Sequence, residues 1–418
     1  MDTKLYNNIS EIQETKKDQE IAMKNQEIVM KDQETAKQEL YALWQECFGD
    51  SHAYTDFYFK WKVKDNQILS IYKNDELSSM LHLNPYIVTV QGKKVSSNYI
   101  VGVATRQQNR RQGQMKSLLE VALHEMYQEH MPFTYLCPAA EAIYLPFGFR
   151  IVYEQERWNQ LLLETRLLSR HKPKHKLKAD TFNKETIDSL TVVALGLADK
   201  VRIEELVSFS NQQLLQRYDV YIERTPYYYE RLLHEITSTG GEVLLCYRNE
   251  QLVGYASYMA EDGIYVTEYI YSLEEKDAVM EAISAFTEKT VNQGIYEVKN
   301  ESAPTIMVRI VDWNSFVLNI SATEETRIVM EVKDNIIEEN NGIYALQFTK
   351  QGCKITRTKE KPEVSADIAD LSRLFFARLT EKELTGIVKK EEKKDKKEIL
   401  SKLKKINIYK KVFINDVV

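Results

Sequence analysis

Cysteine, long apolar runs and positive charge are all in short supply in this chain. Its four cysteines form no C-x-x-C pair and its seven histidines follow no metal-ligand spacing, so we expect a reducing compartment and no bound metal. No apolar stretch is long enough to cross a bilayer, and the polar N-terminus does not resemble a signal peptide. A formal net charge of −6 argues against a general binder of nucleic acid or acidic membranes. These absences predict a cytoplasmic protein with no membrane span and no nucleic-acid partner.

What is present suits a globular chain of several domains. The 418 residues are 43% hydrophobic and 28% charged, which is enough for about two to four domains. A seven-residue repeat runs through Lys17–Met23, Lys24–Met30 and Lys31–Lys37. Its apolar residues are adjacent and form no coiled-coil seam, while Glu–Lys pairs at i,i+4 support a helix. We interpret residues 1–38 as a helical extension that is either solvated or in contact with a partner.

The most informative stretch is a strand-like run, Tyr99–Thr105, that leads through a polar loop into a helical segment, Gln114–Tyr127. The loop holds Arg110, Arg111 and Gly113 just before the helix. A helix N-terminus offers unpaired N–H groups and the positive end of a dipole, and glycine lets the backbone approach a phosphate closely. The pattern therefore indicates a pyrophosphate-binding turn, although Arg-Arg-x-Gly alone also occurs in many solvated turns.

The segments around this turn indicate which class of phosphate-binding protein it belongs to. Two helical segments, Leu40–Phe48 and Phe57–Trp61, precede a meander of strands over residues 68–105. After the phosphate turn and its helix, Phe133–Cys137 reads as a strand and Ala140–Phe149 as a short helix that ends at Phe-Gly-Phe. This order of elements is similar to that of the GNAT acyltransferases, in which the loop binds acetyl-CoA.

An internal repeat follows. Val243–Tyr255 matches Ile68–Met80 in register, and both read as strand–turn–strand. The second copy continues into a strand, Ile264–Tyr271, and a helix, Leu273–Lys289. The junction Ser272–Asp277 has three acidic residues and no glycine, and such a loop would repel a pyrophosphate. We therefore expect a second domain of the same architecture without a cofactor loop.

The last third of the chain has its own pattern. Ile368–Arg378 is an amphipathic helix, and the charged stretch Lys389–Lys397 reads as a solvated loop or helix face. The apolar C-terminal segment, residues 408–418, is expected to tuck into the core as a helix or strand, because termini are usually polar and exposed. The strand-like runs of this region are Met307–Asp312, Arg327–Lys333, Gly342–Thr349 and Cys353–Thr358.

From Glu39 to Val418 the chain resembles the Eis-type (enhanced intracellular survival) GNAT N-acetyltransferases. The resemblance implies an α+β fold of tandem GNAT domains with mixed, mostly antiparallel sheets, followed by a sterol-carrier-protein-like α+β domain. It also implies a homo-oligomer, a hexamer in this family. The expected domains are the extension 1–38, a catalytic GNAT domain 39–155, a degenerate GNAT domain 156–303 and the third domain 304–418. The segments that carry the resemblance are Leu43–Asp50, Val103–Thr105, Arg110–Gly113, Ala140–Phe149 and Met307–Asp312.

The resemblance also implies roles for individual residues. Acetyl-CoA would be the co-substrate, Tyr144 the general acid, and the C-terminal carboxylate, here on Val418, the general base. Two residues depart from the family pattern, since Gln107 stands where proline is common and Met115 where a small residue is common. The first strand expected before the first helix is also missing from its usual place. The positions expected to bind acetyl-CoA are Val103, Ala104, Thr105, Arg110, Arg111, Gln112, Gly113, Gln114, Met115, Lys116, Ala139 and Ala140.

The expected activity is acetyl-CoA-dependent N-acetylation of a primary amine on a small-molecule or peptide acceptor that is cationic, aminoglycoside-like or lysine-like. An amine attacks a thioester only when neutral, so a base must take its proton. An α-carboxyl with a pKa of about 3.3–3.7 is too weak a base in water, but burial near Phe413, Ile414 and Val417 would raise its pKa. Two other classes stay open. One is a non-catalytic protein that binds a lipid or peptide through the third domain, and the other is an assembly scaffold that uses the repeat arm.

Overall fold

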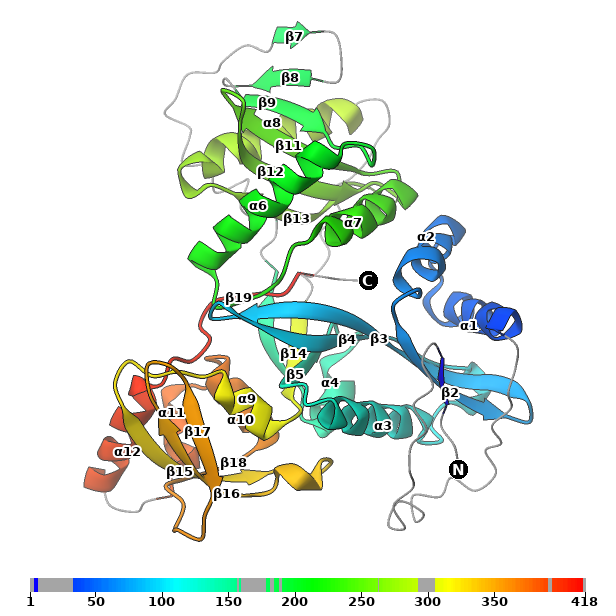
Figure 1. The fold of residues 1–418 in the computed structure, drawn as a ribbon. Coiled ribbons are helices and arrows are strands. Elements are labelled where there is room, and N and C mark those ends of the chain that lie inside the picture. The colour runs from blue at the N-terminus through cyan, green and yellow to red at the C-terminus, as the bar shows by residue number, and fades with distance from the viewer. Residues whose placement is uncertain are drawn as a thin grey trace.

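The computed structural model describes residues 4–6, 33–155, 158, 178–180, 184–187, 190–261, 263–291, 305–389 and 393–415. These residues form a central nine-stranded sheet and two further sheets of six and four strands, each with its own helices (Figure 1). Most neighbouring strands are antiparallel, and the parallel pairs are β4–β5, β10–β19 and β15–β18. The predicted α+β architecture with mixed, mostly antiparallel sheets is confirmed.

The central sheet has the order β1-β2-β3-β4-β5-β14-β6, with β10 and β19 beside the far half of β3. Its long strands β3 and β4 form the hairpin on which the rest is built. The bounds are β1 (Lys4–Tyr6), β2 (Gln67–Lys73), β3 (Glu76–Val90), β4 (Lys93–Thr105), β5 (Phe133–Leu136), β6 (Arg150–Glu154), β10 (Val220–Ile222), β14 (Thr305–Ile310) and β19 (Val412–Phe413).

Helices cover the two sides of the central sheet, with α1 and α2 on one side and α3 on the other (Figure 1). One face of α3 is apolar, since Leu118, Leu119, Ala122, Leu123 and Met126 are all buried at the i, i+3 and i+4 spacing of a core-facing helix. The bounds are α1 (Gln33–Phe48), α2 (His52–Phe57), the π-helical η2 (Tyr58–Lys62), the 3₁₀ turn η3 (Gln107–Asn109), α3 (Gln114–Gln128), α4 (Glu141–Tyr144) and the 3₁₀ turn η4 (Leu145–Phe147).

The first strand lies at the very start of the chain, before the repeat rather than after it. β1 pairs antiparallel with β2, with Lys4 opposite Ser70. The helix α1 begins at Gln33, within the last repeat. The range 1–38 that the repeat suggested as an extension therefore also contains an edge strand and the start of α1. The first two repeats lie outside the described residues.

Three strands from later parts of the chain complete the central sheet. β14 lies between β5 and β6 and is antiparallel to both. β10 comes from the predicted second domain and β19 from the C-terminal segment. The predicted third domain, which begins at residue 304, thus starts with a strand that belongs to the first sheet. Residues 412–414 are buried, which agrees with the expectation that the apolar C-terminal segment enters the core.

The second sheet has the order β13-β12-β11-β9-β8-β7, and its first hairpin repeats that of the central sheet. In β2–β3 the register shifts between Ile71 and Tyr72, and in β11–β12 it shifts between Cys246 and Tyr247, which are the matching positions of the sequence repeat. Both turns place two successive residues at positive φ, as type I′ hairpins require. The bounds are β7 (Lys178–Asp180), β8 (Lys184–Ile187), β9 (Leu190–Ala194), β11 (Glu242–Arg248), β12 (Gln251–Met259), β13 (Tyr265–Tyr271), α6 (Lys200–Arg217), α7 (Pro226–Ser238), the 3₁₀ turn η5 (Leu273–Glu275) and α8 (Lys276–Val291).

The third sheet has the order β17-β16-β15-β18. Three of its strands were predicted from the sequence, and β18, which runs parallel to β15, was missed because it is short. Part of the charged stretch 389–397 lies in α12. The bounds are α9 (Trp313–Leu318), β15 (Thr326–Lys333), the 3₁₀ turn η6 (Glu338–Asn340), β16 (Gly342–Phe348), β17 (Cys353–Arg357), β18 (Val364–Asp367), α10 (Ile368–Phe375), α11 (Glu381–Ile387) and α12 (Lys393–Lys405).

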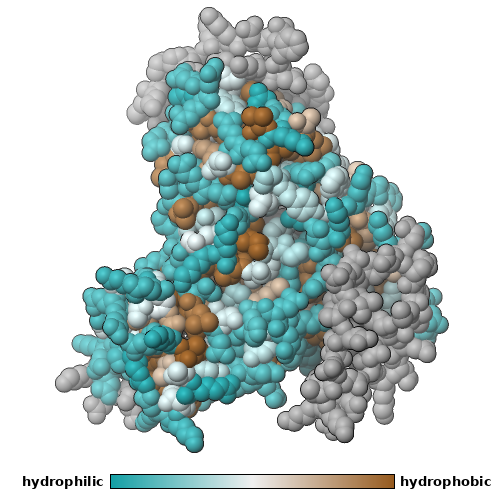
Figure 2. All heavy atoms as spheres, in the orientation of Figure 1, coloured by the Kyte–Doolittle hydropathy of each residue, from teal (hydrophilic) through white to brown (hydrophobic). Residues whose placement is uncertain are grey.

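The described surface is mixed in character. On the face drawn in Figure 2 hydrophilic residues predominate, and apolar residues form separate patches. Among the residues that the structure describes, no helix combines the length and the apolar composition that a membrane crossing requires.

Candidate active site

The central sheet opens between the parallel strands β4 and β5. The register of β4 and β5 contains a single pair, Tyr99 with Tyr135. On the near side of that pair two side chains tie the strands together, since Ser97 Oγ donates to the Phe133 carbonyl at 2.8 Å and Thr134 Oγ1 to the Asn98 carbonyl at 2.7 Å. Beyond Tyr99 the ladder of β4 continues with β3 alone. The strands therefore part on the side that leads to Thr105 and the phosphate turn.

A β-bulge sits in the open half of β4. Val101 pairs with His82 and Ala104 with Met80, so Gly102 and Val103 together face one residue of β3. Gly102 has φ +60, and a Cβ there would lie 2.7 Å from Cζ3 of Trp44, so only glycine fits. A bulge takes backbone groups out of the ladder. It can therefore present the backbone of Val103 to a ligand in the opening.

The two predicted residues after the bulge have more fixed surroundings. The Ala104 carbonyl accepts from Ser79 Oγ at 2.7 Å, and the Thr105 carbonyl accepts from Arg110 Nε at 3.1 Å. Thr105 Oγ1 lies 2.8 Å from Ser79 Oγ. These contacts hold the end of β4 in place directly before the turn.

The predicted phosphate turn has the backbone of an anion site. Arg111 has φ +62 and Gly113 has φ +81, and backbones that alternate left- and right-handed conformations form concave N–H nests for anions. Gly113 is also the N-cap of α3, and the helical ladder begins only with Ser117 N–H, which donates to the Gly113 carbonyl at 3.1 Å. The amides before Ser117 therefore precede the helical ladder, and they coincide with the positive end of the helix dipole.

The charges of the turn differ in how they are paired. Arg106 forms an ion pair with Glu46 at 2.7 Å, so its charge is already neutralised and we do not count it among the groups that bind an anion. Within the described part of the chain no carboxylate pairs with Arg110 or Arg111, and both side chains are exposed. Lys73 Nζ donates to Gln112 Oε1 at 3.1 Å. The turn thus offers two exposed guanidinium groups to an anion.

Three of the predicted cofactor residues have side chains that already contact other parts of the protein. Gln114 is buried, and its Oε1 accepts from Ser78 Oγ at 2.8 Å, so only its backbone can face a ligand. Lys116 lies 3.7 Å from Glu120 in an exposed i,i+4 pair. Such pairs are weak, so Lys116 can still turn toward an anion. Met115 is half-buried and packs on the core.

Tyr144 ends the short helix α4, which follows the exposed residues Ala139 and Ala140. Its side chain is 7% exposed, and its ring packs edge-on against Phe149 at 6.1 Å. Burial, with a smaller contribution from the nearby Cys137 thiol, raises the pKa of Tyr144 to about 12. The hydroxyl is therefore protonated at neutral pH and able to donate.

The predicted base lies outside the described residues, which end at Asn415. The segment that leads to Val418 is nevertheless well anchored. Ile414 is fully buried, and Asn415 Nδ2 donates to the Thr267 carbonyl of the second domain at 2.8 Å. The described tail therefore runs into the junction between the first and second domains.

A buried polar cluster beside the bulge was not predicted. His82 Nδ1 lies 3.0 Å from Tyr58 Oη, which also accepts from Asn66 Nδ2 at 3.1 Å. Burial lowers the pKa of His82 to about 3, so the imidazole is neutral. The signal in the sequence was the alternation of His82 and Asn84 with Leu81 and Leu83 in β3, and Val-Gly-Val within β4.

The matching junction of the second copy differs as expected in its chemistry. In place of an arginine-rich turn it has η5, whose Glu275 accepts from Arg248 Nε at 2.6 Å and from Arg248 Nη2 at 2.6 Å. A carboxylate held at this position would repel a phosphate. The absence of a cofactor loop from this domain stays a prediction.

The opened strand pair, the bulge beside the opening and the basic turn at the N-terminus of α3 all lie within one stretch of the chain that matches a known family. Residues 29–152 match the family described as acetyltransferase (GNAT) domain, and residues 314–406 match the family described as sterol carrier protein domain. The chain thus contains a GNAT acetyltransferase domain, and the prediction of an N-acetyltransferase is confirmed. Domains of this type generally use acetyl-CoA as co-substrate.

Solved structures share the fold over nearly the whole chain, whereas no curated protein matches the sequence. A probable N-acyltransferase from Enterococcus faecalis has 16% identity and a TM-score of 0.70, covering 93% of this chain and 99% of its own. A GCN5-related N-acetyltransferase from Anabaena variabilis has 18% identity and a TM-score of 0.66, covering 93% and 98%. Eis1 from Mycobacterium abscessus has 14% identity and a TM-score of 0.64, covering 94% and 100%. At these identities the likeness is one of fold.

Proposed function

We propose that this protein is an Eis-type N-acetyltransferase that transfers the acetyl group of acetyl-CoA to a primary amine of a cationic acceptor, aminoglycoside-like or lysine-like. The observation that carries the proposal is the bulge at Gly102–Val103, which lies where β4 and β5 part and leads directly to the basic turn of α3. Acetyl-CoA needs a donor for its thioester carbonyl oxygen and an anchor for its pyrophosphate, and we expect this strand and turn to supply both.

The chain's own groups divide the binding task. The amides of residues 111–116 and the guanidinium groups of Arg110 and Arg111 would hold the pyrophosphate, because both supply N–H donors and positive charge. The Val103 N–H would face the thioester carbonyl. Donors held in place before the reaction stabilise the negative charge that develops on that oxygen. Ala139 and Ala140, exposed beside α4, would flank the pantetheine.

Proton transfer falls to two groups. Tyr144 would donate to the departing thiolate, since its hydroxyl carries a proton throughout the working pH range. The carboxylate of Val418 would take the proton of the attacking amine. The buried segment before it, Ile414 and Asn415, supports a partly desolvated carboxylate with a raised pKa.

The acceptor class rests on charge. A formal net charge of −6 favours the encounter with polycations. We further propose a cytoplasmic homo-oligomer, on the strength of the resemblance stated above. A lipid- or peptide-binding protein with an inactive first domain is the alternative that the experiment must exclude.

The test is calorimetric titration with acetyl-CoA, followed by a thiol-release assay over a panel of an aminoglycoside, a polyamine and a lysine peptide. Acetyl-CoA should bind, and pantetheine, which lacks the pyrophosphate, should bind far more weakly. At least one amine should release CoA, while its N-acetylated form should not. If acetyl-CoA does not bind, the protein is not an acetyltransferase of this kind.

A further inference from the structure

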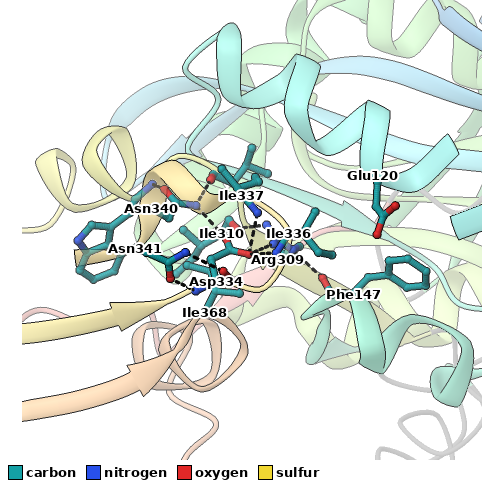
Figure 3. Close-up of polar contacts among 12 residues, drawn as sticks. Glu120, Phe147, Arg309, Ile310, Asp334, Ile336, Ile337, Asn340, Asn341 and Ile368 are labelled. Atoms are coloured by element: carbon teal, nitrogen blue, oxygen red, sulfur yellow. Dashed lines mark hydrogen bonds and ion pairs between the residues drawn. The ribbon is translucent and has the colours of Figure 1, made fainter. Parts of the chain in front are cut away.

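One buried arginine joins the segment that carries Tyr144 to the third domain (Figure 3). Arg309 lies on β14, the strand of the central sheet with which the predicted third domain begins, and its side chain is 0% exposed. Its three guanidinium nitrogens have three separate partners. Nε donates to the Phe147 carbonyl at 2.6 Å, Nη1 to the Ile310 carbonyl at 2.8 Å, and Nη2 to Asp334 Oδ1 at 2.6 Å.

Asp334, directly after β15 in the third domain, is held as firmly as the arginine. Its Oδ1 also accepts from the amides of Ile336 and Ile337, at 3.0 and 3.1 Å, and its Oδ2 accepts from Asn340 Nδ2 at 2.9 Å. The side chain of Asp334 is 0% exposed. A carboxylate with four donors has one orientation, so it fixes the arginine that it binds.

The target of Arg309 is the turn that follows the proposed acid. Phe147 is the last residue of η4, three positions after Tyr144, and Gly148 closes the turn with φ +82. A Cβ at Gly148 would lie 3.2 Å from Arg309 Nε and 3.1 Å from Cγ2 of Ile368. The turn is therefore pressed against Arg309 and α10. Arg150 Nη1 also donates to two carbonyls of the same turn, those of Leu145 and Phe149, at 3.0 and 2.8 Å.

We propose that Arg309, oriented by Asp334 of the third domain, is a positioning residue that sets the place of the Tyr144 hydroxyl in the first domain. The proposal rests on the proposed function of Tyr144. It assigns the third domain a part in the reaction, because the carboxylate that orients Arg309 belongs to that domain. A misplacement of about 1 Å at a reacting group can cost about a hundredfold in rate, so a fixed anchor three residues away matters.

The sharpest variant is Arg309→Lys. It keeps a positive charge opposite Asp334, so the carboxylate is not left unpaired in the core. It lacks the planar fork that reaches Phe147 and Asp334 from different nitrogens. The matched control is Arg378→Lys, because Arg378 also donates its guanidinium from the third domain to a carbonyl of the first, that of Val152, at 2.9 Å from Nε. Val152 lies on β6, beyond the turn.

We expect Arg309→Lys to lower kcat about 10- to 100-fold while the Kd of acetyl-CoA stays within about twofold of the wild-type value. In a Tyr144→Phe background the same change should cost nothing further, since there is no hydroxyl left to position. Hydrogen exchange of peptides covering residues 141–150 should speed up in Arg309→Lys. Arg378→Lys should match the wild type in all these measurements.

The positioning role is overturned if kcat of Arg309→Lys stays within about twofold of wild type, or if its loss is the same with and without the Tyr144 hydroxyl. An equal loss in Arg378→Lys would also overturn it, because the effect would then come from domain docking in general. If Arg309→Lys does not fold, the double variant Arg309→Met with Asp334→Leu replaces it. Removing both charges of a buried ion pair costs less stability than leaving one charge unpaired. The same outcomes then decide the proposal. If the wild type does not bind acetyl-CoA, or Tyr144→Phe turns over normally, the proposed function itself fails, and the positioning role falls with it.

Discussion

At the scale of single residues, the chemistry depends on what burial does to Tyr144. An exposed tyrosine titrates at about pH 10, whereas burial raises the pKa of this one to about 12. A motif in the sequence can nominate the residue. Its pKa, however, is set by the side chains around it, among them Phe149 and Cys137. The same holds for His82, which burial keeps neutral.

Tyr144→Phe should lower turnover about 10²–10⁴-fold, the usual cost of losing a general acid, with the Kd of acetyl-CoA within about twofold of wild type. The measurement is steady-state kinetics with the best amine of the panel, together with calorimetric titration. The control is Tyr127→Phe, which also removes a tyrosine hydroxyl but at the C-terminal end of α3, away from the phosphate turn. It should leave both values unchanged. A Tyr144→Phe enzyme that turns over like the wild type would show that the ring serves packing alone.

At the scale of elements, the turn before α3 is shaped by backbone conformation more than by side-chain space. A Cβ at Gly113 would meet no atom within 4 Å, so what glycine supplies here is its φ of +81. Together with Arg111 at φ +62 it curls the backbone so that successive amides converge. The sequence placed this turn correctly, because a strand, a loop with glycine and a helix follow one another without a gap.

Gly113→Asp should weaken acetyl-CoA binding at least about a hundredfold, because a carboxylate would stand where the pyrophosphate binds and a non-glycine residue is strained at this φ. Gly92→Asp is the matched control, since Gly92 also has φ +81 and open space around it but lies in the β3–β4 turn. Titration of both variants with acetyl-CoA, after a check of their thermal unfolding, separates the effects. Equal affinity in the two variants would contradict the assignment of the loop.

The helix α3 also carries a pH-dependent weakness. Burial, helped by Glu129, raises the pKa of Glu125 from 4.5 to about 7, and neither carboxylate oxygen has a hydrogen-bond partner among the described residues. The folded state then binds more protons than the unfolded state between these two pKa values. The contribution of protonated Glu125 to the free energy of unfolding is therefore complete below about pH 4.5. It is lost as the pH rises to about 7.

Glu125→Gln should accordingly stabilise the protein by about 2 kcal/mol at pH 8, a figure already reduced for the partial exposure of the side chain. At pH 4 the two proteins should be equally stable. Denaturant unfolding at both pH values measures this difference. Glu129→Gln removes only the smaller cause and should give a smaller gain, and a Glu125→Gln protein no more stable than wild type at pH 8 would disprove the raised pKa.

At the scale of the whole molecule, the central sheet is assembled from segments that lie far apart in the chain. β1 comes from the start of the chain, β14 from the start of the predicted third domain, β10 from the predicted second domain and β19 from the C-terminal tail. The first domain therefore needs the other two to complete its sheet, and the described tail ends against the second domain at Asn415. This closeness of the tail to the first domain is what the proposed base requires.

A C-terminal extension should remove most activity, because an amide replaces the Val418 carboxylate and added residues compete for the acceptor site. Acetyl-CoA should still bind, since its loop belongs to another part of the first domain, and Val418→Leu should be tolerated because it keeps the carboxylate. Thiol-release rates of extended, Val418→Leu and wild-type proteins decide the matter. If the extended protein is as fast as the wild type, the base is another group, and Glu141, beside Tyr144, is the next candidate.

The sequence by itself determined what depends on neighbours along the chain. The two matching hairpins, the glycine turn before α3 and the α+β class all follow from local periodicity and residue type. Only the tertiary structure decided which strands share a sheet. That Lys4–Tyr6 pairs with β2 across the repeat, and that β14 enters between β5 and β6, follows from packing between segments that the local pattern cannot relate. The need for glycine at 102 and the partners of Arg309 have the same origin, since Trp44 and Asp334 reach them through the fold.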